Sequence, residues 1–130
     1  MDEGRRPVRS YRDLKVWQRS MELAVECHRL SRALPRRGAA GLGAQIERAA
    51  ASVPANIAEG CGRRTRPDYL RHLSIANGSL LELETHVLIA SRLGLLKPGQ
   101  LATVLGLSAE TGRLLSGLIR KLNAMNQGTP

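Results

Sequence analysis

Apolar residues recur at a spacing of three to four positions along most of this chain, and the pattern is interrupted at proline- and glycine-containing stretches. This period is that of an α-helix with a buried face, and no alternating run of β-branched residues is long enough to indicate a strand. The pattern divides into four segments: residues 13–34, 42–60 and 65–93, and a fourth that follows a turn at residues 97–99 and runs to residue 123. The sequence therefore predicts an all-α protein.

The connections between the four segments carry start and stop signals for helices. Pro35 follows the first segment, Gly60 closes the second and Gly94 closes the third. Residues 65–68 (TRPD) are typical of a capping box at a helix start, with the proline in the first turn, where its missing donor costs nothing. Four helices joined by short loops favour an up-down-up-down bundle.

The length of 130 residues corresponds to one domain. We expect a basic N-terminal arm over residues 1–12, the bundle over 13–123 and a frayed tail over 124–130. No apolar run is long enough to span a membrane, and the N-terminus lacks the apolar stretch of a signal peptide, so we expect a cytoplasmic protein. Cys27 and Cys61 are predicted to lie about 20 Å apart along the bundle, so we expect no disulfide.

Two of the predicted helices carry more apolar surface than one buried face requires. In the first helix, one stripe holds Leu14, Trp17, Met21, Ala24, Val25 and His28, and a nearly opposite stripe holds Val16, Leu23, Cys27, Leu30 and Leu34. One side of a bundle needs a single stripe, so the second stripe predicts an exposed interface and a homo-oligomer. The predicted interface residues are Val16, Leu23, Leu30, Ile75, Leu83 and Ile89. The alternative is a monomer with unusually wide apolar helix faces.

The chain is strongly basic, with 20 lysine and arginine residues against 11 aspartate and glutamate residues and a formal charge of +9. In the predicted bundle, the start of the first helix and the turn between the second and third helices lie at the same end. The arginines expected there are Arg5, Arg6, Arg9, Arg12, Arg63, Arg64, Arg66 and Arg71, with Arg36 and Arg37 at the opposite end. Clustered guanidinium groups suit phosphates, and an aromatic content of 2% excludes a base-stacking platform. The sequence thus predicts contact with the backbone of RNA or DNA; the alternative is a solvated basic surface.

No set of residues is suited to catalysis. The sequence contains neither a Walker phosphate-binding loop nor a hydrolase nucleophile motif, and its three histidines lack the Glu-x-x-His spacing of a di-metal bundle. Asn77 and Glu84 fall among leucines on the third helix, where buried polar groups are expected to pair with neighbours. We therefore expect no enzymatic activity, no metal ion and no cofactor.

Three parts of the chain carry a family resemblance. They are residues 11–18 (YRDLKVWQ), residues 45–60 (QIERAAASVPANIAEG) and several short matches within residues 62–85. Together they resemble the four-helix-bundle proteins encoded in the intervening sequences of bacterial 23S rRNA genes, over residues 11–122. The chain departs from that family at Cys61 and His72, where phenylalanine is common.

The resemblance implies a homopentameric ring of up-down bundles. It also implies a relation in fold to the accessory variability proteins of diversity-generating retroelements, which bind nucleic acid and a reverse transcriptase. From the residues and the resemblance together we expect a non-enzymatic homo-oligomer that binds nucleic-acid backbones through arginine-rich ends. The alternative is a protein-interaction scaffold that docks a partner such as a reverse transcriptase, without direct nucleic-acid binding.

Overall fold

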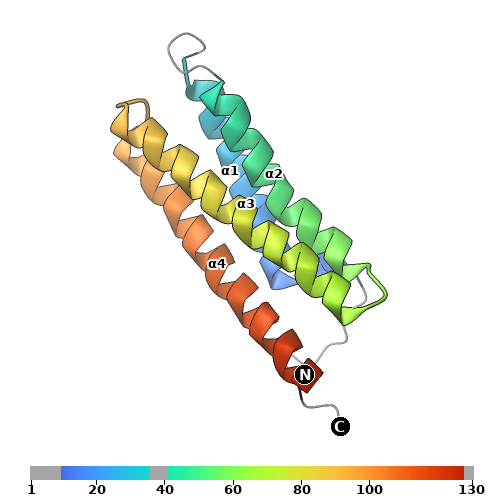
Figure 1. Ribbon diagram of the computed structural model, residues 1–130. Coiled ribbons are helices and arrows are strands. Elements are labelled where there is room, and N and C mark those ends of the chain that lie inside the picture. Colours follow the sequence, from blue (N-terminus) through green and yellow to red (C-terminus); the bar gives the residue numbers. More distant parts are fainter. Residues whose placement is uncertain (1–9, 36–40, 128–130) are drawn as a thin grey trace.

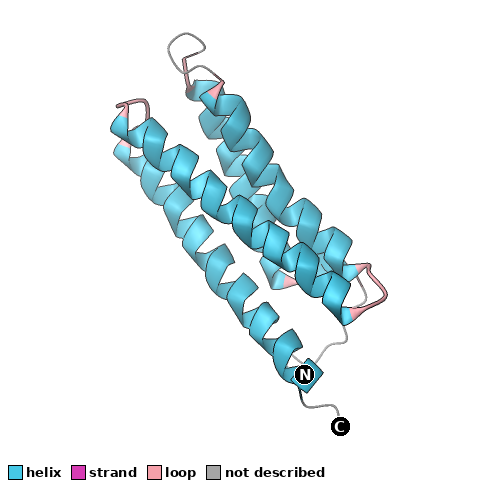
Figure 2. Ribbon diagram, viewed as in Figure 1, coloured by secondary structure: helices cyan, strands magenta, loops and turns pink. Residues whose placement is uncertain are grey.

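The computed structural model describes residues 10–35 and 41–127 of the chain. Over these residues a short 3-10 turn precedes four long helices (Figure 1). The elements are η2 (Tyr11–Asp13), α1 (Lys15–Ala33), α2 (Leu42–Cys61), α3 (Arg66–Arg92) and α4 (Pro98–Gln127). No strand occurs within the described ranges, and Figure 2 shows helices joined by loops. The prediction of an all-α fold with four helices is confirmed.

The helical part of the chain begins earlier and ends later than the sequence predicts. Ser10 caps η2, because its Oγ accepts from the backbone N–H of Arg12 at 3.0 Å and its own N–H donates to Asp13 Oδ2 at 3.3 Å. Leu14 is extended, with φ −76° and ψ 123°, and separates this turn from α1. Residues 10–14 are therefore part of the folded unit, although the sequence predicts an arm through residue 12. At the other end α4 continues to Gln127, past its predicted end at residue 123.

The connection from α2 to α3 follows the local signals in the sequence. Thr65 is the N-cap of α3, and its Oγ1 accepts a hydrogen bond from the backbone N–H of Asp68 at 3.2 Å. Pro67 lies in the first turn of α3, where a missing N–H leaves no hydrogen bond unmade. α3 ends before Gly94, whose φ of 75° lies in the left-handed region that glycine adopts without strain.

Each helix contacts two neighbours: α1 and α3 both contact α2 and α4. On the α2–α3 side, the hydroxyls of Ser52 and Ser79 lie 2.8 Å apart, and Asn56 Oδ1 lies 3.2 Å from His72 Nδ1. Later residues of α2 thus meet earlier residues of α3. α2 also continues through the buried Pro54, so the predicted helix is not divided there.

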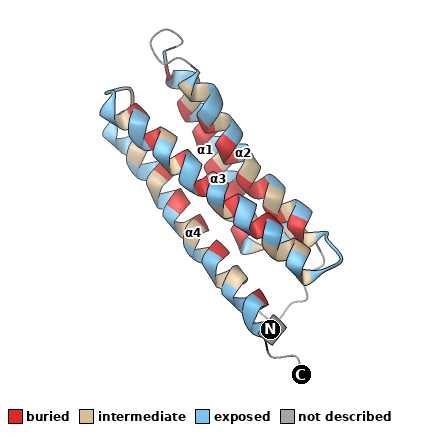
Figure 3. Ribbon diagram, viewed as in Figure 1, coloured by how far each residue is buried: buried red, intermediate tan, exposed pale blue. Residues whose placement is uncertain are grey.

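The core fills the space that the four helices enclose, and Figure 3 shows buried positions recurring along the helices. Its largest fully buried aliphatic side chains are Leu23, Ile46, Val53, Ile57, Leu73, Leu83, Val87 and Leu115. Burial of each contributes about 1.5–3 kcal/mol to the free energy of folding. The buried Ser20 and Thr111 donate to the backbone carbonyls of Trp17 and Leu107, both at 2.8 Å, so their hydroxyls are satisfied.

The predicted oligomer interface is wrong at four of its six residues. Val16, Leu23, Leu30 and Leu83 have exposed fractions of 4%, 0%, 3% and 0%. They belong to the core of a single chain and cannot form an exposed patch. The physical reason is that the stripe containing Leu23 is the one that neighbouring helices cover.

The opposite stripe of α1 is the one that remains outside. Met21 and Val25 have exposed fractions of 38% and 46%, although the prediction treats their stripe as the bundle-facing one. The other two predicted interface residues, Ile75 and Ile89 on α3, do lie at the surface, with exposed fractions of 42% and 43%. The single chain therefore carries exposed apolar side chains, on faces only partly predicted.

None of the four helices combines the length and the apolar character needed to span a membrane.

Candidate nucleic-acid interface

The predicted arginines that the structure describes lie on η2, in the turn after α2 and in the first turns of α3. Arg12 is exposed on η2, and Arg63 and Arg64 are exposed in the turn after α2. Arg66 is half-buried at the start of α3, and Arg71 is exposed one turn further on. Arg5, Arg6 and Arg9, and also Arg36 and Arg37, lie outside the described residues.

Packing of η2 brings Arg12 to the turn between α2 and α3. η2 contacts both α1 and α2. Tyr11 makes an edge-to-face contact with Trp17 of α1, with 5.2 Å between ring centroids. The Arg12 guanidinium carbon in turn lies 5.6 Å from the Tyr11 ring centroid, within cation–π range. Two aromatic rings therefore hold Arg12 at this end of the bundle.

Two further basic residues, Arg120 and Lys121, reach the same end from α4. The hydroxyl of Ser108 donates to Glu84 Oε1, and a Cβ built on Gly112 would lie 3.5 Å from Leu80 Cδ2. The later residue of α4, Gly112, thus meets the earlier residue of α3, Leu80, so the two helices are antiparallel. The last turns of α4 therefore lie beside the first turns of α3 (Figure 1). We call the resulting set the basic end; it comprises Arg12, Arg63, Arg64, Arg66, Arg71, Arg120 and Lys121.

Sequence reasoning missed Arg120 and Lys121. Both are exposed on α4. The signal that could have found them is the helix register: counting equal distances in both directions from the loop at residues 93–97 places residue 120 level with the start of α3.

Acidic residues neutralise only part of the basic end. Arg63 Nη2 lies 2.5 Å from Glu59 Oε1, and Arg71 Nε lies 3.6 Å from Asp68 Oδ1. Within residues 10–35 and 41–127, Arg64 and Arg66 make no ion pair. Two guanidinium groups therefore carry uncompensated charge beside the start of α3.

The start of α3 adds to the positive potential of Arg64 and Arg66. A helix N-terminus carries a partial positive charge, so cations placed there are unfavourable until an anion approaches. Asp68 in the first turn offsets part of this charge. An anion bound at the basic end would interact favourably with both guanidinium groups and with the helix end.

The Cys27 thiol and the Tyr69 phenol stay protonated at neutral pH. Both cysteines are free, and burial raises the pKa of the Cys27 thiol to about 12. Burial, together with the neighbouring Cys61, also raises the pKa of Tyr69 well above its usual value. These groups add no negative charge against the basic end.

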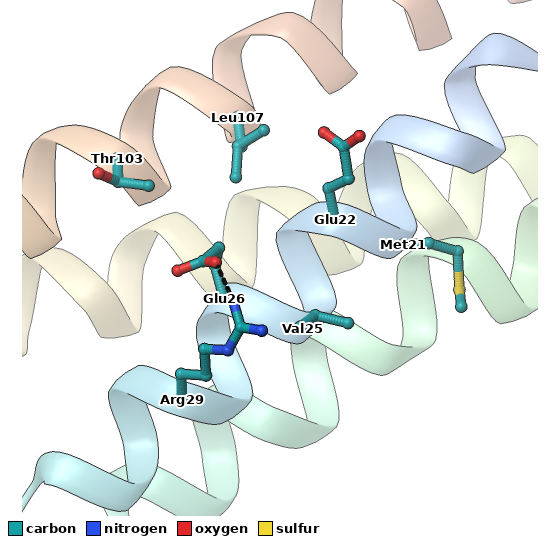
Figure 4. A pocket seen from close by; sticks show the side chains of 7 residues that line it. All are labelled: Met21, Glu22, Val25, Glu26, Arg29, Thr103 and Leu107. Atoms are coloured by element: carbon teal, nitrogen blue, oxygen red, sulfur yellow. Dashed lines mark hydrogen bonds and ion pairs between the residues drawn. The ribbon is translucent and has the colours of Figure 1, made fainter.

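A groove between α1 and α4 contains none of the residues of the basic end (Figure 4). Its lining residues are Met21, Glu22, Val25, Glu26, Arg29, Thr103 and Leu107. The carboxylate of Glu26 lies 2.6 Å from Arg29 Nη1, and that of Glu22 lies 3.0 Å from Arg19 Nη1. The groove thus presents apolar side chains between carboxylates that are already paired.

Glu84 and two of the histidines pair with neighbours, although His28 is exposed. Glu84 is half-buried and accepts from Ser108, as predicted for a carboxylate among leucines. His28 Nδ1 lies 3.2 Å from Glu47 Oε1, and His86 Nε2 lies 3.4 Å from Glu82 Oε1. In the part of the chain that the structure describes, no three His, Cys, Asp or Glu side chains are grouped so that they could hold a metal ion.

The fold and this site define a small all-helical protein with a group of cationic side chains at one end. The chain belongs to the 23S rRNA-intervening sequence protein family, whose sequence model matches residues 12–117. The resemblance read from the sequence is confirmed at the level of the family.

A solved structure supports the same assignment. It is the crystal structure of a protein with unknown function from the S23 ribosomal protein family of Bacteroides thetaiotaomicron, and it matches with a TM-score of 0.75 and 28% sequence identity. The match covers 80% of this chain and 97% of that chain. No curated protein sequence matches the chain.

Proposed function

We propose that this protein is a non-enzymatic, cytoplasmic nucleic-acid-binding protein that contacts the phosphate backbone through its basic end. In this proposal its helices form an up-down-up-down bundle that assembles into a homopentameric ring. The names of the family and of the solved relative refer to ribosomal RNA and to a ribosomal protein, in keeping with a nucleic-acid partner.

One observation carries the proposal. Arg64 and Arg66 lie beside the N-terminus of α3 without an acidic partner among the described residues. Arg120 and Lys121 extend the same cationic surface onto another helix. Guanidinium groups bind phosphate oxygens through two parallel hydrogen bonds, and release of counterions from the nucleic acid adds to the affinity.

The proposed contact reads the backbone rather than the bases. The basic side chains project from a turn and from helix ends, not from one helix face that could enter a major groove. The described aromatic side chains nearest to the basic end are engaged in packing: Tyr11 against Trp17, and Tyr69 against the core cluster. Binding without stacking or base contacts is expected to depend strongly on salt and weakly on sequence.

The test compares two charge-matched double variants across a salt series with labelled RNA and duplex DNA. Arg64→Gln with Arg66→Gln removes two charges from the basic end. Arg29→Gln with Arg32→Gln removes two charges from the last turns of α1, which are not part of the basic end. For duplex DNA, we expect the first pair to reduce the slope of log affinity against log salt by about 1.8, and the second pair to leave it unchanged. Absence of binding by the wild-type chain even at roughly 50 mM salt would overturn the proposal.

A second candidate function rests on a different observation. Leu81 and Leu88 on α3 have exposed fractions of 56% and 45%, and Leu93 reaches 59%. Exposed leucines on one helix suit a protein interface, so the chain could instead act as a scaffold that docks a partner such as a reverse transcriptase. Capture of that partner that survives nuclease treatment and high salt would favour this candidate over phosphate binding.

A further inference from the structure

A chain of polar groups leads from the backbone of α2 to the basic end. Asn56 Nδ2 donates to the backbone carbonyl of Ser52 at 2.9 Å and contacts Ser52 Oγ at 3.0 Å. A carbonyl can only accept, so the amide nitrogen of Asn56 must face Ser52. Its Oδ1 is thereby turned toward His72, where it lies 3.2 Å from Nδ1.

The orientation of Asn56 fixes the protonation of the His72 ring. An amide oxygen accepts only, so Nδ1 of His72 must carry the hydrogen. The Oε2 atom of Glu59, 4.0 Å from Nδ1, places negative charge on the same side and favours that hydrogen. Nη2 of Arg71 lies 3.3 Å from Nε2 and can only donate, so Nε2 must keep its lone pair and the ring is neutral.

His72 and Arg71 differ sharply in exposure. The His72 side chain is 6% exposed, whereas the side chain of Arg71 is 58% exposed. The buried ring therefore supplies an acceptor to a cation at the surface, and Asp68 at 3.6 Å contacts the same guanidinium through Nε. The remaining N–H groups of Arg71 are available to a ligand at the basic end.

We propose that His72 is a positioning residue: as a neutral ring protonated on Nδ1, it holds the Arg71 guanidinium for contact with a nucleic-acid phosphate. This inference rests on the proposed function. A long cationic side chain loses conformational freedom when it binds, and an acceptor that restricts it beforehand lowers that cost. His72 touches no ligand itself and acts through Arg71.

The first test reads the tautomer directly in the free protein. Nitrogen-15 NMR of the imidazole rings at neutral pH distinguishes a protonated nitrogen from one with a lone pair. We expect His72 to carry its hydrogen on Nδ1 and a lone pair on Nε2. A hydrogen on Nε2 of His72 would overturn the proposal, because Nε2 could then accept nothing from Arg71.

The second test measures duplex-DNA affinity at fixed salt. His72→Phe removes the acceptor, and we expect it to weaken binding about two- to tenfold, the cost of ordering one long side chain. His72→Gln can present its amide oxygen to Arg71 in place of Nε2, so it should retain most of the affinity. In an Arg71→Ala background, His72→Phe should have no further effect. Thermal unfolding of each variant confirms that the chain is folded at the assay temperature.

The outcomes separate this inference from the proposed function. Wild-type affinity in His72→Phe, or an equal loss with and without Arg71, would overturn the positioning role while leaving the proposed function in place. If the wild-type chain binds no duplex DNA and no RNA, the proposed function fails, and the positioning role fails with it.

Discussion

Gly60 on α2 lies so close to His72 on α3 that a Cβ built on Gly60 would stand 2.8 Å from the Cβ of His72. The same Cβ would lie 3.1 Å from Cδ1 of Tyr69 and 3.2 Å from the Tyr69 carbonyl oxygen. Real Cβ atoms essentially never approach another atom within 3.0 Å, so at the distance to His72 only glycine fits. The absence of a side chain at Gly60 sets the spacing of α2 and α3 next to the basic end.

We therefore predict that Gly60→Ala destabilises the protein by about 1–3 kcal/mol, because the added methyl group forces the two helices apart. Gly78→Ala is the matched control, since a Cβ on Gly78 meets nothing within 4 Å and its φ is helical. The control should stabilise the chain by about 0.5–1 kcal/mol through helix propensity. Urea unfolding monitored by circular dichroism measures both changes, and equal effects at the two glycines would contradict the close packing.

The fold could be predicted from the sequence because its signals are local. The N-cap at Thr65 is recognisable from four consecutive residues, and the structure contains the bond from its hydroxyl to the Asp68 N–H. By contrast, the two apolar stripes of α1 have similar composition, and only the neighbouring helices decide which is buried. Leu23 is fully buried and Val25 is 46% exposed for that reason alone.

The candidate site shows the same division. The arginines of the α2–α3 turn are adjacent in sequence, so their clustering could be predicted. Arg120 and Lys121 join them only through the register between α3 and α4, which depends on contacts such as Ser108 with Glu84. The link from Asn56 through His72 to Arg71 depends on the geometry of two packed helices, which sequence spacing does not define.

The exposed and the buried residues of the predicted interface should respond differently to substitution. Ile75→Ser with Ile89→Ser alters exposed side chains, so we expect it to weaken self-association while the free energy of unfolding changes little. Leu83→Ala empties a fully buried position and should destabilise the fold by about 2–5 kcal/mol. Light scattering measures the mass of the assembly against the 14.1 kDa chain. A wild-type mass of one chain would contradict self-association, and retention of the assembly in the double variant would exclude this face.

The stability of the protein should fall at alkaline pH because of Cys27. Burial raises the pKa of its thiol from 9.0 to about 12, so the unfolded chain loses this proton at lower pH than the folded chain. Below pH 9 both states hold the proton and the thiol has no effect; above it the unfolded state is favoured, by about 1.4 kcal/mol for each pH unit up to the folded pKa.

Denaturant titrations from pH 7 to 11 measure this dependence. Cys27→Val keeps an apolar side chain at the site and removes the titrating group, so its stability should fall less steeply over the alkaline range. The raised pKa of Tyr69 acts in the same direction in both proteins and remains as a common background. Identical pH profiles for wild type and Cys27→Val would contradict the assignment to Cys27.

Removal of one acidic residue should strengthen nucleic-acid binding. The carboxylate of Glu59 lies 2.5 Å from Arg63 Nη2, so in the wild-type chain Arg63 is paired within the protein. Glu59→Gln releases this guanidinium to phosphates, and we expect higher affinity and a salt slope for duplex DNA that is steeper by about 0.9. Glu26→Gln is the matched control, because it adds the same charge beside Arg29, whose Nη1 lies 2.6 Å from Glu26, away from the basic end. A steeper slope in both variants would show that total charge governs binding, and an unchanged slope in Glu59→Gln would remove Arg63 from the interface.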